Sequence, residues 1–216
     1  MNPQQKNRLV AGIAIGVILG SSIWIYFTQF RNAYHNQALH QHIGEIMADQ
    51  AAKTLGPRGH IVSIAIDTKD WPELKFQLDA FRAKLKKLGQ YDLREYEMDT
   101  KDQPKYGVGS GLSGRRYVRT VKKNTKADLF VSFIGAPKLS AEEIAELGSK
   151  PKLLVESRSG DNLPGLFENK LVVAAVVSRF QFPAPGPEKP RTIEDWFQKR
   201  YQIVTPESVQ GLQTRE

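Results

Sequence analysis

Residues 128–135 read DLFVSFIG, and residues 60–67 read HIVSIAID. Both runs are short, apolar and rich in β-branched residues, as expected of parallel strands that are buried on both faces of a sheet. Further strands are predicted at residues 91–99, 152–157, 171–178 and 201–205.

Helical patterns alternate with these strands. Apolar residues recur at helical spacing over 74–88, Ser140 and Glu143 form a capping box, and Thr192 caps a last helix. The alternation predicts an α/β fold: a three-layer sandwich with a mostly parallel five- or six-stranded sheet, for which we favour the strand order 2-1-3-4-5. Ligands of such sheets bind beyond the carboxyl ends of the strands.

The N-terminal region carries an uncharged stretch, residues 9–30. About 20 apolar helical residues cross a bilayer core of roughly 30 Å, so we predict one transmembrane helix here. A cleaved signal peptide is the alternative, but the apolar run is too long for one. Trp24 is expected at the membrane interface. Gly12, Gly16 and Gly20 form a small-residue stripe that would let a second helix approach, although glycine is also common in membrane helices without this role.

The charges that flank this stretch predict its orientation. Lys6 and Arg8 precede it, and only Arg31 follows closely. The positive-inside rule then places residues 1–8 in the cytoplasm and the α/β domain outside it. In a bacterium this describes a single-pass protein of the inner membrane with a periplasmic domain.

The rest of the chain divides into three parts. We predict a helical stalk over 31–57, the α/β domain over 58–205 with a proline-rich connection at 181–190, and a tail over 206–216. The sequence has no cysteine, which excludes disulfides, thiolate metal sites and thiol catalysis. The net charge of +8 favours anionic lipid or acidic protein surfaces as partners. We expect no nucleic acid, cofactor or metal ion.

One glycine-rich segment is a candidate anion site. Residues 109–114 read GSGLSG and open a helix, where backbone N–H groups can hold an anion. The segment follows the second strand instead of the first, which argues against a dinucleotide site, and a plain flexible loop is the alternative. The candidate ligand-binding residues here are Gly109, Gly111, Ser113, Gly114, Arg115 and Arg116.

The strand ends supply a second candidate set. Asp67, Asp99, Glu156, Arg158 and Arg179 follow or end successive strands, so one rim of the sheet should carry them all. The arginines could bind an anionic ligand. The alternative is that they pair with the neighbouring acids.

A basic helix is predicted over 113–124. Arg119, Lys122 and Lys126 continue a stripe of positive charge that could contact anionic lipid or an acidic partner, although such a run is often only a solvated face. No serine lies in a G-x-S-x-G elbow, and His60 at a strand start is the sole histidine of the domain. We therefore predict no catalytic residues.

Three stretches resemble a known family: HIVSIAIDTKDW, SGLSGRRYVRTVKKN and KADLFVSFIGAPKLS. From Gly59 to about Arg179 the pattern is similar to one lobe of a periplasmic substrate-binding protein of the ABC-transporter type. The resemblance implies a fold. Those proteins close two lobes over a ligand, whereas this chain has room for one, so ligand capture does not follow from the resemblance.

These patterns lead to three functional hypotheses. The first is a non-enzymatic accessory or structural subunit of a membrane complex, whose α/β domain docks on partners outside the cytoplasm. The second is a membrane-tethered binding module for a small anionic ligand. A carboxylate- and metal-dependent enzyme is the third and least favoured.

Overall fold

The computed structural model describes residues 3–25, 31–69, 71–98, 112–148, 151–179 and 185–212. The chain divides into two compact units, Met1–Ala38 and Leu39–Glu216. Each unit is described by itself below.

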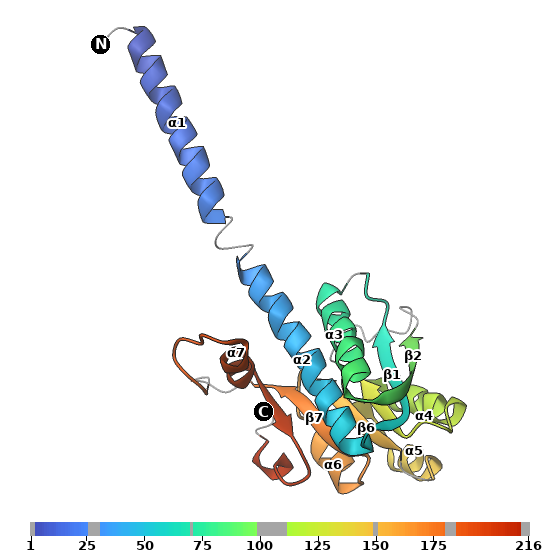
Figure 1. Ribbon diagram of the computed structural model, residues 1–216. Helices are drawn as coiled ribbons and strands as arrows, with labels where there is room; N and C mark the ends of the chain where they lie inside the picture. The colour runs from blue at the N-terminus through green and yellow to red at the C-terminus, as the bar shows by residue number, and fades with distance from the viewer. Residues whose placement is uncertain are drawn as a thin grey trace. The chain divides into compact units, whose positions relative to one another are not determined.

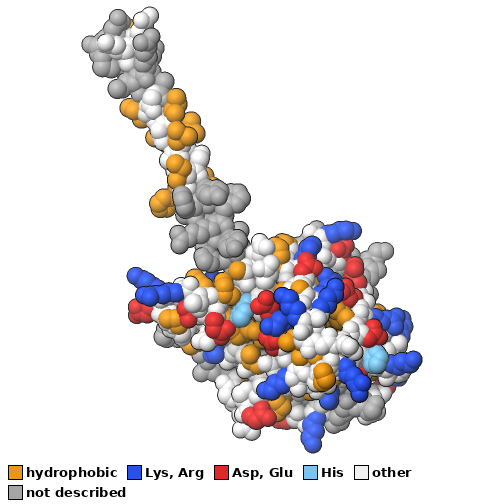
Figure 2. Space-filling view, in the orientation of Figure 1, with side chains coloured by type: hydrophobic (Ala, Val, Ile, Leu, Met, Phe, Trp, Pro, Cys, Tyr) orange, Lys and Arg blue, Asp and Glu red, His pale blue; other side chains and the backbone are white. Residues whose placement is uncertain are grey.

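The first unit contains helix α1, Pro3–Ile25, and the start of α2, Arg31–Leu55 (Figure 1). Figure 2 shows hydrophobic side chains along the described part of α1. Within the residues that the structure describes, no helix combines the length and hydropathy needed to span a membrane. The span predicted over 9–30 includes residues 26–30, which lie outside the described ranges.

The second unit is built on a six-stranded sheet of order β2-β1-β4-β6-β7-β8. All neighbouring strands pair in parallel except β7 and β8, which are antiparallel. The predicted order is therefore confirmed, with a sixth strand added at one edge. The strands are β1 (Arg58–Ile66), β2 (Gln90–Met98), β4 (Leu129–Ser132), β6 (Lys152–Ser157), β7 (Val172–Ser178) and β8 (Tyr201–Val204).

The helices of the domain follow the predicted alternation. They are α3 (Pro72–Leu88), α4 (Gly114–Lys123), α5 (Ala141–Glu146), α6 (Leu163–Glu168) and α7 (Ile193–Arg200), with a short 3-10 helix η3 (Val209–Gly211) near the end. Both predicted caps are present: the Ser140 and Thr192 hydroxyls accept hydrogen bonds from the backbone N–H groups of Glu143 and Asp195. A two-stranded ladder of β3 (Leu112–Ser113) and β5 (Pro137–Lys138) was not predicted.

Helices cover both faces of the sheet. Alternation along β4 sends Phe130 to one face, and Phe133, just after the strand, to the other. Phe130 packs edge to face against Tyr117 of α4, with 6.0 Å between the ring centroids. Phe133 packs in the same way against Phe81 of α3, with 5.3 Å between the ring centroids. In Figure 1, α2 and α3 accordingly lie in front of the strands, on the face opposite α4. This is the three-layer α/β sandwich that the sequence predicted.

Helix α2 contributes to the core of this unit from Leu39 onward. Leu39, Ile43, Met47 and Ala51, four residues apart in sequence, are all buried. The C-terminal half of the helix predicted as a stalk thus packs on the domain. In the described part of the predicted tail, Leu212 also packs against the core.

Candidate functional site

The carboxyl edge of the parallel sheet is where a ligand site is expected in this fold. A small cavity of about 50 Å³ lies at this edge, beside the end of β6. Four structural elements line it, and they come from distant parts of the sequence. The lining residues are Glu156 and Arg158 at β6, Trp71, Glu73, Leu74 and Gln77 at the start of α3, His40 of α2, and Tyr201 of β8.

Glu156 is the distinctive residue of this cavity. It is 6% exposed and is the buried charged residue of the sheet's carboxyl edge. Burial raises its pKa to about 7, against the opposing attraction of Arg158. Near neutral pH, both the acid and the carboxylate are therefore populated. Such a group can donate or accept a hydrogen bond inside the cavity.

Tyr201 and His40, which also line the cavity, each have one protonation state at neutral pH. Burial, with a further effect from Glu156, raises the pKa of Tyr201 to about 12, so its hydroxyl stays protonated. The side chain of Gln77 is hydrogen-bonded to His40, with 3.1 Å between Nε2 and Nδ1. Burial lowers the pKa of His40, so its imidazole is neutral at pH 7.

The predicted strand-end residues separate in the structure. Arg158 lines the cavity, but Asp67 is engaged locally: its Oδ1 accepts a hydrogen bond from the Lys69 backbone N–H at 3.0 Å. The Arg179 Nε donates to the Tyr201 backbone carbonyl oxygen at 2.8 Å, which ties β7 to β8. Asp99 lies outside the described residues.

The predicted glycine-rich site is described in part. Gly109 and Gly111 lie outside the described residues, whereas Ser113 and Gly114 are at the start of α4. A Cβ atom on Gly114 would lie 2.1 Å from Oε2 of Glu143 and 2.3 Å from the backbone oxygen of Lys138. The close packing of β5 and α5 therefore requires glycine at this position. Arg115 is exposed and Arg116 half-buried on the same turn of α4.

The basic stripe predicted on α4 is interrupted. Arg119 is exposed, but the Lys122 ammonium is paired with Glu146 of α5, 2.5 Å from its Oε1. The helix ends at Lys123, so Lys126 lies in the turn beyond it and does not continue the helical stripe. On α1, a Cβ atom added at Gly12, Gly16 or Gly20 would meet no described atom within 4 Å. Contact with a partner at these positions remains a prediction.

Sequence reasoning missed most of the cavity. Glu156 left a signal, because it is the one charged residue inside the apolar run LLVES, but Trp71, Gln77, His40 and Tyr201 left none. Within the described ranges, no three acidic or histidine side chains are placed to hold a metal ion.

No protein-family model matches the sequence, and no curated protein matches it either. Solved structures do share its fold. An ABC transporter solute binding protein from Burkholderia graminis C4D1M, in complex with D-arabinose, superposes with a TM-score of 0.55 at 15% identity. The match covers 82% of this chain and 62% of that one.

Two further structures agree with this result. An arabinose binding protein from Geobacillus stearothermophilus gives a TM-score of 0.54 at 13% identity, covering 81% of this chain and 63% of that one. A mutant XylFII–LytSN complex gives a TM-score of 0.51 at 15% identity, and the match covers 79% of this chain and 68% of that one.

The resemblance to a binding-protein lobe is thus confirmed at the level of the fold. Two of these three neighbours are named as binding proteins. The chain spans about two thirds of the length of these proteins, and its α/β unit has the fold of a solute-binding protein lobe.

Proposed function

We propose that this chain is a membrane-tethered binding module, whose α/β domain holds a small, neutral, hydroxyl-bearing solute at the carboxyl edge of its sheet. The observation that carries the proposal is the buried Glu156 carboxyl group, which lines a cavity and whose pKa burial raises to about 7. A hydroxyl group of a ligand could exchange a hydrogen bond with this carboxyl group in either of its protonation states.

The chemistry of the cavity favours a neutral ligand over an anionic one. Two carboxyl groups, Glu73 and Glu156, face one guanidinium, Arg158, so an anion would meet like charge. With a pKa near 7, Glu156 can pair with a hydroxyl group as donor or acceptor. The volume of about 50 Å³ admits a single hydroxyl or hydroxymethyl group, and the rest of the ligand would lie outside the cavity. Sugar ligands of two structural neighbours support this choice of solute class.

Calorimetric titration of the full-length protein with D-arabinose, D-xylose, D-glucose and D-galactose tests the proposal. We expect saturable binding of at least one sugar, weakened about tenfold or more in Glu156→Gln, because the amide cannot exchange donor and acceptor roles in the same way. Glu168→Gln, an exposed change at the end of α6, is the matched control. Absence of saturable binding for the whole panel, or equal binding by Glu156→Gln, would contradict the proposal.

We further propose that α1 provides the membrane tether. Ile13, Ile15, Val17, Ile18, Leu19 and Ile23 are 57–63% exposed. At about 100° per residue these positions point in all directions around the helix, and a helix that is apolar all round is typical of a buried or membrane-embedded segment. With Lys6 and Arg8 on the N-terminal side, the domain would lie outside the cytoplasm, at a bacterial inner membrane.

Alkaline extraction of membranes from cells that express the full chain tests the tether. The protein should remain in the pellet, whereas Ile15→Arg/Ile18→Arg should release it to the supernatant, because a charged residue near the bilayer centre costs about 3 kcal/mol. Wild-type protein in the supernatant would exclude the tether. The proposed ligand site at Glu156 does not depend on that result.

The role of an accessory subunit is a second candidate. It is favoured by the small-residue face of Gly12, Gly16 and Gly20, which no described atom covers, and by one structural neighbour that was solved as a protein complex. Mild-detergent purification should then recover a stoichiometric membrane partner, and Gly16→Leu should weaken the association. Recovery of the chain alone would exclude this role.

A further inference from the structure

The amino edge of the sheet carries two neighbouring hollows, at the opposite end of the strands from Glu156. The larger has a volume of about 640 Å³ and lies where β1, β2 and β6 begin. The second, of about 400 Å³, lies between β1, β2 and the turn after α4. The two hollows share His60 and Asp92, and together they form what we call the amino-edge groove.

Positive charge predominates in this groove. Within the described part of the chain, none of its five cations forms an ion pair within 4 Å. Two carboxylates, Asp92 and Asp128, oppose them, which leaves a formal excess of three positive charges. The five cations are Arg58, Arg94, Lys123, Lys126 and Lys152.

One of the two carboxylates already has protein partners. The Asp128 Oδ2 accepts a hydrogen bond from the His60 backbone N–H at 2.8 Å and lies 3.2 Å from the His60 Nδ1. These bonds, with a smaller effect of Lys152, lower the pKa of Asp128. The Asp128 carboxylate thus positions the start of β1, and most of the positive charge in the groove is left without a counter-charge.

Several cations elsewhere on the domain form ion pairs. Arg82 bridges Asp79 and Glu95, Lys84 pairs with Asp49, and Lys122 pairs with Glu146. The five cations of the amino-edge groove come from four segments of the chain and converge on one concave surface. Like charges gathered in a concave surface repel one another, and they raise the local concentration of anions.

We propose that the amino-edge groove binds a small organic polyanion, a molecule that carries two or more phosphate or carboxylate groups. The volume of the larger hollow is that of a small-molecule site. Arg58 and Lys152 line one hollow, and Lys123 and Lys126 line the other, so a ligand that spans both would meet cations at each end. This site is separate from the cavity at Glu156 and does not depend on the function proposed for it.

Calorimetric titration of the full-length protein with pyrophosphate and with citrate at low salt tests this proposal. We expect saturable one-to-one binding of at least one anion, and loss of about tenfold in affinity in each of Arg58→Ala, Lys126→Ala and Lys152→Ala. All three side chains are exposed, so unchanged thermal unfolding should accompany the loss. Binding of pyrophosphate alone assigns a phosphate ligand, and binding of citrate alone assigns a carboxylate ligand.

Lys69→Ala is the matched control, because Lys69 is an exposed lysine that follows β1 at the carboxyl edge. The Lys69→Ala and Glu156→Gln variants should both bind the anions with the affinity of the wild type. Two outcomes would overturn the proposal: no saturable binding of either anion, or an equal loss of affinity in Lys69→Ala, which would show an unspecific response to net charge.

Discussion

Gly44 of α2 lies directly against the backbone of Gln77 in α3. A Cβ atom on Gly44 would come within 2.1 Å of the Gln77 carbonyl oxygen and within 3.0 Å of its Cα atom. The two helices therefore meet backbone to backbone. This contact also brings His40, one turn earlier on α2, to the Gln77 side chain in the cavity wall. Close helix packing thus helps to shape the proposed ligand site.

Gly44→Ala should destabilise the domain. The added methyl group must push α2 away from α3, and overpacking of this kind costs about 1–3 kcal/mol in the free energy of unfolding. Gly165→Ala in α6 is the control, since a Cβ atom there would meet nothing within 4 Å; helix propensity makes it neutral or slightly stabilising. Urea unfolding monitored by circular dichroism measures both. Equal stability of Gly44→Ala and wild type would contradict the observed packing.

Glu156 should make folding less favourable as the pH rises. Its pKa is about 7 in the folded protein, compared with 4.5 ordinarily, so the folded state binds the proton more tightly. The resulting stabilisation is complete below about pH 4.5, declines as the pH approaches 7, and is absent above it. The change is of order 3 kcal/mol in the free energy of unfolding, from about 1.4 kcal/mol per pKa unit.

The measurement is the difference between wild type and Glu156→Gln in urea unfolding from pH 4.5 to 8. The amide cannot ionise, so the difference isolates Glu156 from carboxyl groups whose pKa is lowered, such as Asp128 and Glu194, and which act in the opposite direction. Glu156→Gln should be the more stable protein at pH 8. Parallel pH profiles for the two proteins would show that Glu156 is not buried as described.

Tyr117→Phe should stabilise the domain. The Tyr117 hydroxyl is buried without a hydrogen-bond partner among the described residues, and burial raises the pKa of the phenol well above its usual value. Removing an unsatisfied buried hydroxyl gains about 1 kcal/mol, while the edge-to-face contact with Phe130 is kept. Thermal unfolding measures the change, with Tyr117→Leu as the destabilising comparison. A lower melting temperature for Tyr117→Phe would reveal a partner for the hydroxyl.

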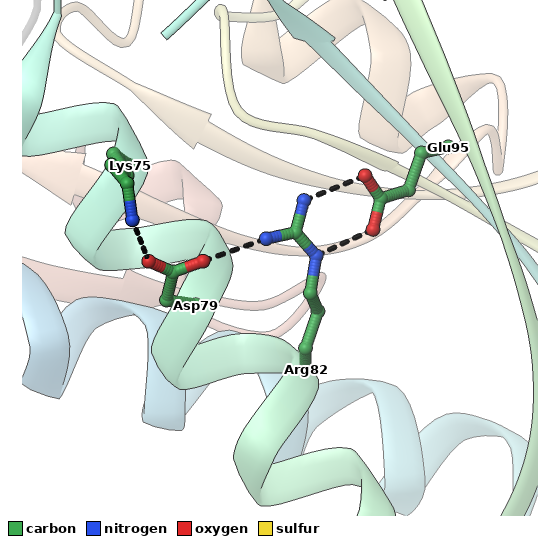
Figure 3. A network of polar contacts seen from close by, with 4 residues as sticks. All are labelled: Lys75, Asp79, Arg82 and Glu95. Atoms are coloured by element: carbon green, nitrogen blue, oxygen red, sulfur yellow. Dashed lines mark hydrogen bonds and ion pairs between the residues drawn. The ribbon is translucent and has the colours of Figure 1, made fainter.

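The network in Figure 3 should couple α3 to the edge strand β2. The Arg82 guanidinium binds Glu95 in a two-pronged contact at 2.5 and 2.6 Å, and Asp79 at 2.7 Å. A double-mutant cycle of Arg82→Ala and Glu95→Ala should give a coupling free energy of about 0.5–1 kcal/mol, which high salt reduces. The pair of Lys84 and Asp49, a single contact at 3.4 Å, should give less. A larger coupling for that pair would contradict this ranking.

The strands and helices of the domain could be predicted because each depends on a local pattern. The apolar runs at 60–67, 128–135 and 152–157 became β1, β4 and β6, and the capping residues Ser140 and Thr192 begin their helices as expected. Alternating strands and helices leave few arrangements in which every apolar face is buried. The strand order therefore followed from the same information.

The local pattern was not sufficient for the ladder of β3 and β5 or for the antiparallel direction of β8. Two-residue strands carry no periodicity, and the direction of an edge strand depends on how the preceding segment crosses the sheet. The prediction of a continuous basic stripe on α4 was wrong for a related reason. Its helical spacing was extended to Lys126, beyond the helix end that was predicted at residue 124 and that the structure has at Asn124. Glu146, more than twenty residues away, neutralises Lys122.

Sequence patterns therefore sufficed for the fold class, the strand order and the apolar N-terminal stretch, because each of these is encoded in neighbouring residues. The two proposed sites depend on tertiary contacts. Glu156, Tyr201 and His40 line one cavity because β6, β8 and α2 meet at the carboxyl edge of the sheet. Arg58 and Lys126 line the two neighbouring hollows at the amino edge. Residues separated by as many as 161 positions, such as His40 and Tyr201, can meet only when burial of the core brings their elements together.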